Sequence, residues 1–132
     1  MKPLTDKVRD FLREAPVCRI ATVKPDGTPQ IIPVCPVFDG ATFYIDLDSE
    51  SVSASGVKAN GRITVLVDEY SDDWNKLRAV ILRTRAEVIE GEWQEVAWAM
   101  IREKFPQYIQ VEWNPRMTLA LTIEGWSQWG FD

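Results

Sequence analysis

The side chains that could do chemistry in this chain do not include histidine, which is absent from the sequence. Without it, the histidine-activated serine and cysteine nucleophiles, imidazole ligation of haem and most zinc sites are excluded. The acidic pairs Asp46/Asp48 and Asp72/Asp73 could act as acid and base or bind a metal, but neither has a glycine loop or a calcium-binding pattern beside it. We interpret both pairs as solvated turns and predict no metal site. Chemistry must therefore come from a cofactor or from carboxylates.

A serine-rich segment, residues 48–60, is a candidate for binding an anion. Its sequence, DSESVSASGVKAN, contains four serines. Hydroxyl groups and unpaired backbone N–H groups at a helix start favour phosphate. The same residues could equally form a solvated turn in which Ser49 or Ser51 caps a helix. The segment alone leaves both interpretations open.

Cysteine usage, charge and hydropathy indicate where the protein works. Cys18 and Cys35 each lie in a strand-like run, and we predict that both are unpaired thiols acting as small core residues. The net charge is −5 and the basic residues are dispersed, so no nucleic-acid partner is expected. The apolar stretches 30–38 and 63–67 are far shorter than the ~20 residues of a membrane helix, and residues 1–16 lack the continuous apolar centre of a secretory signal. We expect a cytoplasmic protein without a membrane partner.

The elements that must position these residues are mostly strands. β-branched and apolar runs predict six of them, at residues 17–23, 28–38, 41–47, 62–68, 77–90 and 117–124. Proline and glycine in residues 24–27 predict a hairpin turn between the first two. Pro29, Pro33 and Pro36 cannot donate to a sheet ladder, so the second strand is an edge strand or carries a bulge.

Helical spacing appears at two places and is weaker at a third. Residues 4–15 have an amphipathic pattern with Thr5 as a cap, and residues 92–105 have another in which Trp93 is interpreted as a core residue. Residues 48–60 are a short helix or an ordered loop that ends at Gly61. The whole chain, residues 1–132, is thus predicted to form one mainly β domain. Its architecture is a six-stranded antiparallel barrel with helices plugging the ends.

This order of segments resembles the pyridoxamine 5'-phosphate oxidase-like split β-barrel family. The resemblance rests on the strand-turn-strand ATVKPDGTPQIIPV and on the pair NGRITV and LRAVILRTRAEV, and it covers nearly the whole chain. It implies a homodimer that holds FMN, or in a related branch a deazaflavin, in a groove shared by the two subunits. It also implies hydride transfer between the flavin and a small organic substrate.

The resemblance further implies which residues contact the cofactor. The isoalloxazine ring would lie against one strand, the ribityl chain against the next, and the phosphate at the serine-rich segment with a nearby cation. In that order the residues are Ile32, Pro33, Val34 and Cys35; Tyr44, Ile45 and Asp46; and Ser49, Ser51, Ser53 and Lys58. Arg78 is the best further basic candidate, although a charged solvent face would also explain it. Trp129 could cover the partner's groove or fill a dimer interface.

The chain departs from the family at two positions. Many members carry a lysine at the position of Ser53, and its loss removes one charge-assisted contact to phosphate. Members that oxidise pyridoxamine phosphate carry an arginine at the position of Ile32 and arginine and histidine substrate contacts near the C-terminus, and this chain has no histidine, so that activity is not expected here. The leading hypothesis is a flavin- or deazaflavin-dependent oxidoreductase. The alternative is a non-catalytic protein that binds a flavin, another small ligand or no cofactor.

Overall fold

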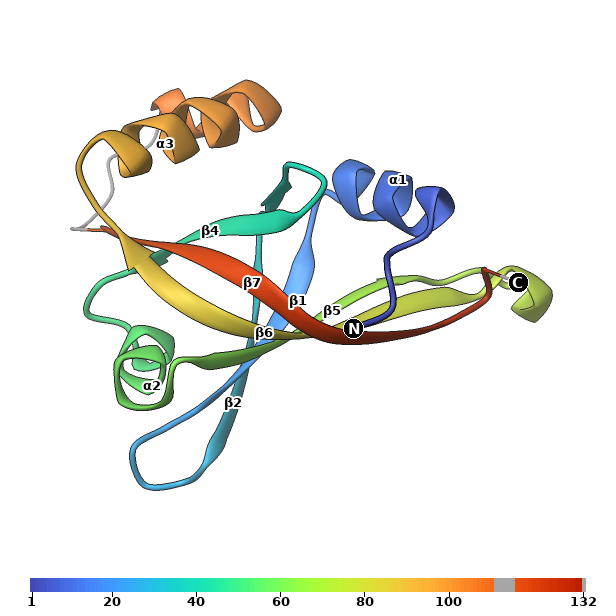
Figure 1. The fold of residues 1–132 in the computed structure, drawn as a ribbon, viewed down its shortest axis with the longest axis horizontal. Coiled ribbons are helices and arrows are strands. Elements are labelled where there is room, and N and C mark those ends of the chain that lie inside the picture. Colours follow the sequence, from blue (N-terminus) through green and yellow to red (C-terminus); the bar gives the residue numbers. More distant parts are fainter. Residues whose placement is uncertain (111–115, 132) are drawn as a thin grey trace.

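The computed structural model of the chain describes residues 1–110 and 116–131. Within these ranges, seven strands form one antiparallel sheet in the order β2-β1-β5-β6-β7-β4-β3. The strands are β1 (Cys18–Val23), β2 (Pro29–Val34), β3 (Val37–Phe38), β4 (Thr42–Asp48), β5 (Arg62–Glu69), β6 (Arg78–Ile89) and β7 (Arg116–Trp129). The helices are α1 (Asp6–Glu14), α2 (Val52–Asn60) and α3 (Glu92–Lys104), with single 3-10 turns at η1 (Trp74–Lys76) and η2 (Pro106–Gln110). Figure 1 shows the sheet curled into a half-barrel, with α2 and α3 toward one end and η1 at the other.

The described sheet has seven strands where six were predicted, because residues 28–38 form two strands. β2 pairs with β1 as far as Val34, and β3 then pairs with β4. Cys35 and Pro36 lie between them, and Pro36 has no N–H with which to continue a ladder. The chain therefore leaves one side of the curled sheet and joins the other. β2 and β3 are the two edges of the sheet order, which is the split in the barrel.

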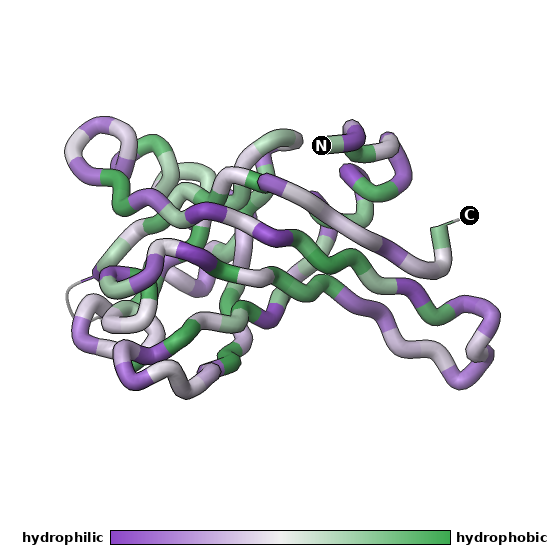
Figure 2. The backbone as a smooth tube through the Cα atoms, turned by 60° about the horizontal axis from the view of Figure 1, so that its bottom comes forward, coloured by the Kyte–Doolittle hydropathy of each residue, from purple (hydrophilic) through white to green (hydrophobic). Residues whose placement is uncertain are grey.

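The core lies inside the curl of the sheet. Burial alternates along β1 and β4, as expected for strands that face the core on one side. The fully buried large side chains come from α1, α3 and five strands: Val8, Leu12, Ile20, Phe43, Ile45, Ile63, Val65, Val67, Leu82, Ile101, Leu119 and Leu121. Figure 2 shows the hydrophobic stretches following the central strands and the hydrophilic ones gathering at turns. Burial of each such side chain contributes about 1.5–3 kcal/mol.

The ends of α2 have the residues that helix termini require. The Ser51 side chain accepts a hydrogen bond from the N–H of Ala54 at 3.1 Å, so Ser51 is the N-cap, as one of the two interpretations held. Gly61 ends the helix in the left-handed region, at φ 74°. Gly56 lets the helix approach β1 closely, because a Cβ there would lie 2.7 Å from the carbonyl oxygen of Val23.

The orientation of α3 differs from the prediction. Trp93 is 75% exposed, so its interpretation as a core residue was wrong. The helix instead buries Ala97 and Ile101, and it places Gln94 and Trp98 half-buried against the sheet. Apolar residues occur on more than one side of this helix, so spacing alone could not identify the buried face. In the part of the chain that the structure describes, no helix is long and apolar enough to cross a bilayer.

Candidate functional site

The buried carboxylate of Asp46 is the centre of a polar network at the end of β4. Its side chain is only 3% exposed, so the interpretation of Asp46 as part of a solvated turn was wrong. Oδ1 accepts hydrogen bonds from the Thr118 hydroxyl at 2.5 Å and from Trp98 Nε1 at 3.3 Å. Oδ2 accepts one from Arg116 Nη2 at 2.5 Å. These partners supply the hydrogen bonds and the positive charge that a buried carboxylate needs.

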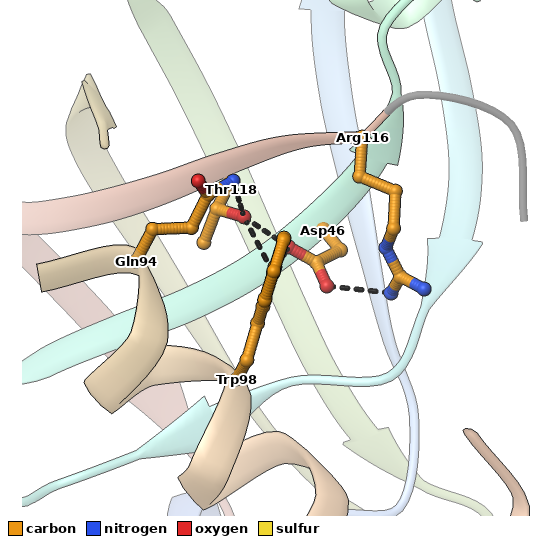
Figure 3. A network of polar contacts seen from close by, with 5 residues as sticks. All are labelled: Asp46, Gln94, Trp98, Arg116 and Thr118. Carbon is orange, nitrogen blue, oxygen red and sulfur yellow. Dashed lines mark hydrogen bonds and ion pairs between the residues drawn. The ribbon is translucent and has the colours of Figure 1, made fainter. Parts of the chain in front are cut away.

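Two residues of α3 complete this network from above the sheet. Gln94 and Trp98 are four residues apart and therefore lie on one face of the helix. Gln94 Nε2 donates to the Thr118 hydroxyl at 3.0 Å, and Trp98 Nε1 donates to the same oxygen at 2.9 Å. Figure 3 shows both side chains pointing from the helix to Thr118 and Asp46, with Arg116 reaching the carboxylate from the other side. The network thus ties α3 to β4 and β7.

Arg116 is fixed by contacts on two sides. In addition to its ion pair with Asp46, its guanidinium lies 4.9 Å from the centre of the Tyr108 ring, a cation–π distance. Its side chain is 18% exposed. Burial raises the pKa of the Tyr108 phenol, and the nearby Cys35 thiol raises it further. The phenol is therefore neutral at physiological pH, and Arg116 carries the positive charge of this pair.

A partly open hollow of about 400 Å³ borders the network. It lies where the β4–α2 loop meets the end of β6, the start of β7 and the start of α3. The residues around it are Ser49, Lys58, Val88, Ile89, Glu90, Gln94, Arg116, Met117 and Thr118. Lys58 Nζ donates to the backbone oxygen of Ser49 at 3.4 Å. Among the described residues, two cations and one carboxylate, Glu90, line the hollow.

The structure brings some of the predicted phosphate residues to this hollow. Ser49 and Lys58 line the hollow. Asp46 does not line it, but its carboxylate accepts a hydrogen bond from Arg116, which does. Ser51 does not line it, because its hydroxyl caps α2. Ser53 is 2% exposed and also lies away from the lining.

The residues predicted to contact the ring and the ribityl chain have mixed environments. On β2, Ile32 and Val34 are half-buried against the core, and Pro33 is exposed on the opposite face. On β4, Ile45 is fully buried, so its side chain cannot touch a ligand. The Tyr44 hydroxyl donates to Asp39 at 3.4 Å.

The two cysteines have different environments. Cys18 is buried, and this burial raises the pKa of its thiol to about 12. Cys35 is half-buried, so its interpretation as a core residue holds only in part. Lys104 Nζ lies nearby and donates to the carbonyl oxygens of Ala15 at 2.7 Å and Pro36 at 2.9 Å. Burial lowers the pKa of Lys104.

Arg78 and Trp129 lie at the far end of the sheet from the hollow. Arg78 begins β6, whereas Ile89, which ends that strand, lines the hollow. Arg78 forms an ion pair with Glu69 at 3.1 Å, and its guanidinium lies 4.7 Å from the Phe11 ring. Trp129 is exposed at the end of β7. Within one chain, these two residues therefore do not join Ser49 and Lys58.

Sequence reasoning missed the residues that hold the network together. Gln94 and Trp98 had a usable signal, since their spacing puts a polar and an aromatic side chain on one helix face. Thr118 stands out as a polar residue within an apolar strand. Arg116 had no local signal, because it lies just outside the predicted strand. No group of three or more His, Cys, Asp or Glu side chains in residues 1–110 and 116–131 could hold a metal ion.

Comparisons with known proteins agree with this fold. The sequence model of the pyridoxamine 5'-phosphate oxidase family, PNPOx_N, matches residues 4–130. None of the curated proteins compared with the chain matches it.

Three solved structures illustrate the likeness. HutZ, a haem storage protein of Vibrio cholerae, has a TM-score of 0.80 at 18% identity, with 96% of this chain and 94% of HutZ covered. An FAD-binding protein of Mesorhizobium loti has a TM-score of 0.76 at 21% identity, with 96% and 95% covered. An F420 reductase has a TM-score of 0.74 at 18% identity, with 94% and 98% covered. These identities support a shared fold only. With the family match over residues 4–130, the chain belongs to the pyridoxamine 5'-phosphate oxidase-like split-barrel family.

Proposed function

We propose that this protein is a flavin- or deazaflavin-dependent oxidoreductase that exchanges a hydride with a small organic substrate. One observation carries the proposal: a hollow beside β4 combines Lys58, Arg116 and Ser49 at the segment where the family resemblance implies a phosphate. The names of two fold neighbours, an FAD-binding protein and an F420 reductase, support the same cofactor class.

The residues around the hollow fit a phosphate group. Phosphate recognition needs positive charge or several hydrogen-bond donors. Lys58 and Arg116 carry the charge, and the Ser49 hydroxyl and the Gln94 amide are further donors at the same hollow. Glu90 is the opposing carboxylate in the lining. The lining therefore offers an anion two cationic side chains and two neutral donors.

The ring of the cofactor requires a second subunit in this proposal. Small-molecule sites usually bury 70–90% or more of their ligand, and the partly open hollow cannot do that alone. The outer face of the sheet carries two apolar cross-strand pairs, Ile31–Ala21 on β2 and β1 and Leu66–Ile81 on β5 and β6. Ile31 is 65% exposed. A second copy of the chain that covers these two apolar pairs gives a homodimer with the flavin at the interface.

In this proposal, the residues of the chain bind and orient the cofactor and exclude water. The flavin ring, when bound, supplies the hydride chemistry. Lys58 and Arg116 bind the phosphate, and Asp46 holds Arg116 in place. The apolar side chains of β2 keep water from the ring. Unpaired thiols at Cys18 and Cys35 suit a reducing cytoplasm, where we place the protein.

A non-catalytic ligand-binding protein is the second candidate. Its support is the burial of Ser53, where many relatives present a lysine, since one charged contact is thereby absent from α2. Haem is less favoured than flavin, although HutZ is a haem protein, because the chain has no histidine to bind the iron.

Reduction of the bound cofactor separates the two candidates. The purified protein is loaded with FMN or a deazaflavin, freed of excess ligand, and mixed with a reduced nicotinamide under anaerobic conditions. An oxidoreductase predicts bleaching of the visible absorbance, faster than for the free cofactor at the same concentration. Bleaching no faster than for free cofactor contradicts the catalytic proposal and favours the binding protein.

A further inference from the structure

We infer that Arg116 is the main phosphate-binding residue for the flavin, in place of the lysine that many relatives carry at the position of Ser53. The inference rests on the proposed function and adds a residue that the family resemblance did not supply. It assigns the phosphate to the hollow between α2, α3 and β7.

The position on α2 cannot supply the missing charge. Ser53 has an exposed fraction of 2%, and its side chain does not line the hollow. Ser51, at the start of the same helix, is committed to the cap contact with Ala54. The basic residue of α2, Lys58, lies in the last turn of the helix and not in its first turn. Positive charge near the phosphate must therefore come from Lys58 or from another element.

Arg116 meets this need from β7. The register pairs it with Asp48 of β4, next to Ser49. It lines the same hollow as Lys58, so the two cations approach one ligand volume from different elements. Arg116 Nη2 contacts Asp46, and the planar guanidinium has the shape to match two phosphate oxygens.

The surroundings of Arg116 orient it before any ligand arrives. Asp46 is anchored by Thr118 and Trp98, and Tyr108 stacks against the guanidinium. A side chain that is already ordered loses little rotamer freedom on binding, which favours affinity. Lys58 has no such support beyond a 3.4 Å contact to a backbone oxygen, and its side chain is exposed. We therefore assign the larger part of phosphate recognition to Arg116.

The test compares FMN with riboflavin, which lacks the phosphate. Fluorescence titrations are made with the full-length wild type, Arg116→Gln, Arg116→Lys and the control Arg62→Gln. Arg62 is an exposed arginine that pairs with Glu124 at 3.3 Å and does not line the hollow, so its loss controls for the removal of one positive charge.

We expect Arg116→Gln to weaken FMN binding about 10- to 100-fold, as for a lost charge-assisted contact. Riboflavin binding should be unchanged, and Arg62→Gln should change FMN affinity less than about threefold. Arg116→Lys keeps the charge without the planar fork, so we expect a loss between wild type and Arg116→Gln. If Arg116→Gln does not fold, Arg116→Lys still tests whether Arg116 binds the phosphate.

Two outcomes overturn the inference but not the proposed function, and a third overturns both. In the first outcome, the wild type prefers FMN to riboflavin, but neither Arg116 variant changes the FMN affinity. The proposed function then stands, and Arg116 has no part in phosphate binding. An equal loss of FMN and riboflavin in a folded variant shows that Arg116 acts only through the structure. A wild type that binds neither flavin nor a deazaflavin overturns the proposed function, and the inference with it.

Discussion

Asp46 and Arg116 are 70 residues apart in the sequence and meet at one end of the sheet, where Oδ2 and Nη2 are 2.5 Å apart. The carboxylate is almost fully buried, whereas the guanidinium reaches the edge of a hollow that also contains Lys58. One residue of the pair therefore faces the protein interior and the other faces the candidate ligand. Under the proposed function, the pair connects the stability of this end of the sheet with the binding of an anion.

Replacing Asp46 with alanine should destabilise the protein by about 2–4 kcal/mol. The change removes a buried acceptor of hydrogen bonds from Arg116, Thr118 and Trp98. Urea unfolding followed by tryptophan fluorescence measures the loss. The control Asp72→Ala, at an exposed turn position, should change the free energy of unfolding by no more than about 0.5 kcal/mol. Equal effects of the two substitutions would contradict the buried network.

Replacing Gly56 with alanine should cost about 1–3 kcal/mol, because the added methyl group meets the backbone of β1. A Cβ at this position lies 2.7 Å from the carbonyl oxygen of Val23, so α2 has to move away from the strand. The matched control is Ser55→Ala, on the exposed side of the same helix. Thermal unfolding of both variants checks the prediction. A Gly56→Ala protein as stable as the control would mean that α2 does not pack this closely.

The stabilising effect of Cys18 should decline at alkaline pH. Burial raises the pKa of this thiol from 9.0 to about 12, so the folded state holds the proton more tightly than the unfolded state. The contribution of the protonated Cys18 thiol to the free energy of unfolding is complete below pH 9, and it is lost as the pH rises from about 9 toward 12. The measurement is the difference in unfolding free energy between wild type and Cys18→Ala at several pH values. That difference should narrow above pH 9, and a constant difference would contradict the burial of the thiol.

The two apolar pairs on the outer face of the sheet, Ile31–Ala21 and Leu66–Ile81, predict a homodimer. Light scattering at micromolar concentration should give a mass about twice that of the 15.1 kDa chain. Ile31→Lys places a charge in the first of these pairs and should shift the protein toward the monomer. Ile109→Lys, at an isoleucine that is 70% exposed on η2, should not. A wild type that is monomeric under these conditions contradicts the shared flavin site.

Much of the fold could be predicted because local chemistry determines it. Pro25 and Gly27 specify the first hairpin, and Gly27 has the positive φ of 89° that its turn requires. Gly61 ends α2 where the Asn-Gly pair predicted a helix end. The two-residue strand β3 was missed because Pro36 interrupts a continuous apolar run, and nothing local shows that the chain changes its neighbour there.

The candidate site was less predictable than the fold because it depends on long-range contacts. The resemblance predicted Ser49 and Lys58 as phosphate-binding residues, because both lie in the serine-rich segment. Arg116 was not, because its partner Asp46 is on a strand far away in sequence and no spacing rule connects them. Arg78 was predicted to join the phosphate, but the length of β6 separates it from the hollow within one chain.

The central claim is that this chain binds a flavin through its phosphate, and FMN loading tests it most directly. The purified protein is incubated with excess FMN, freed of unbound ligand, and its visible absorbance is measured, with riboflavin and a deazaflavin treated in parallel. We predict that about one FMN per chain is retained and that FMN binds at least about tenfold more tightly than riboflavin. A protein that retains none of the three ligands, or that binds riboflavin as tightly as FMN, would contradict the claim.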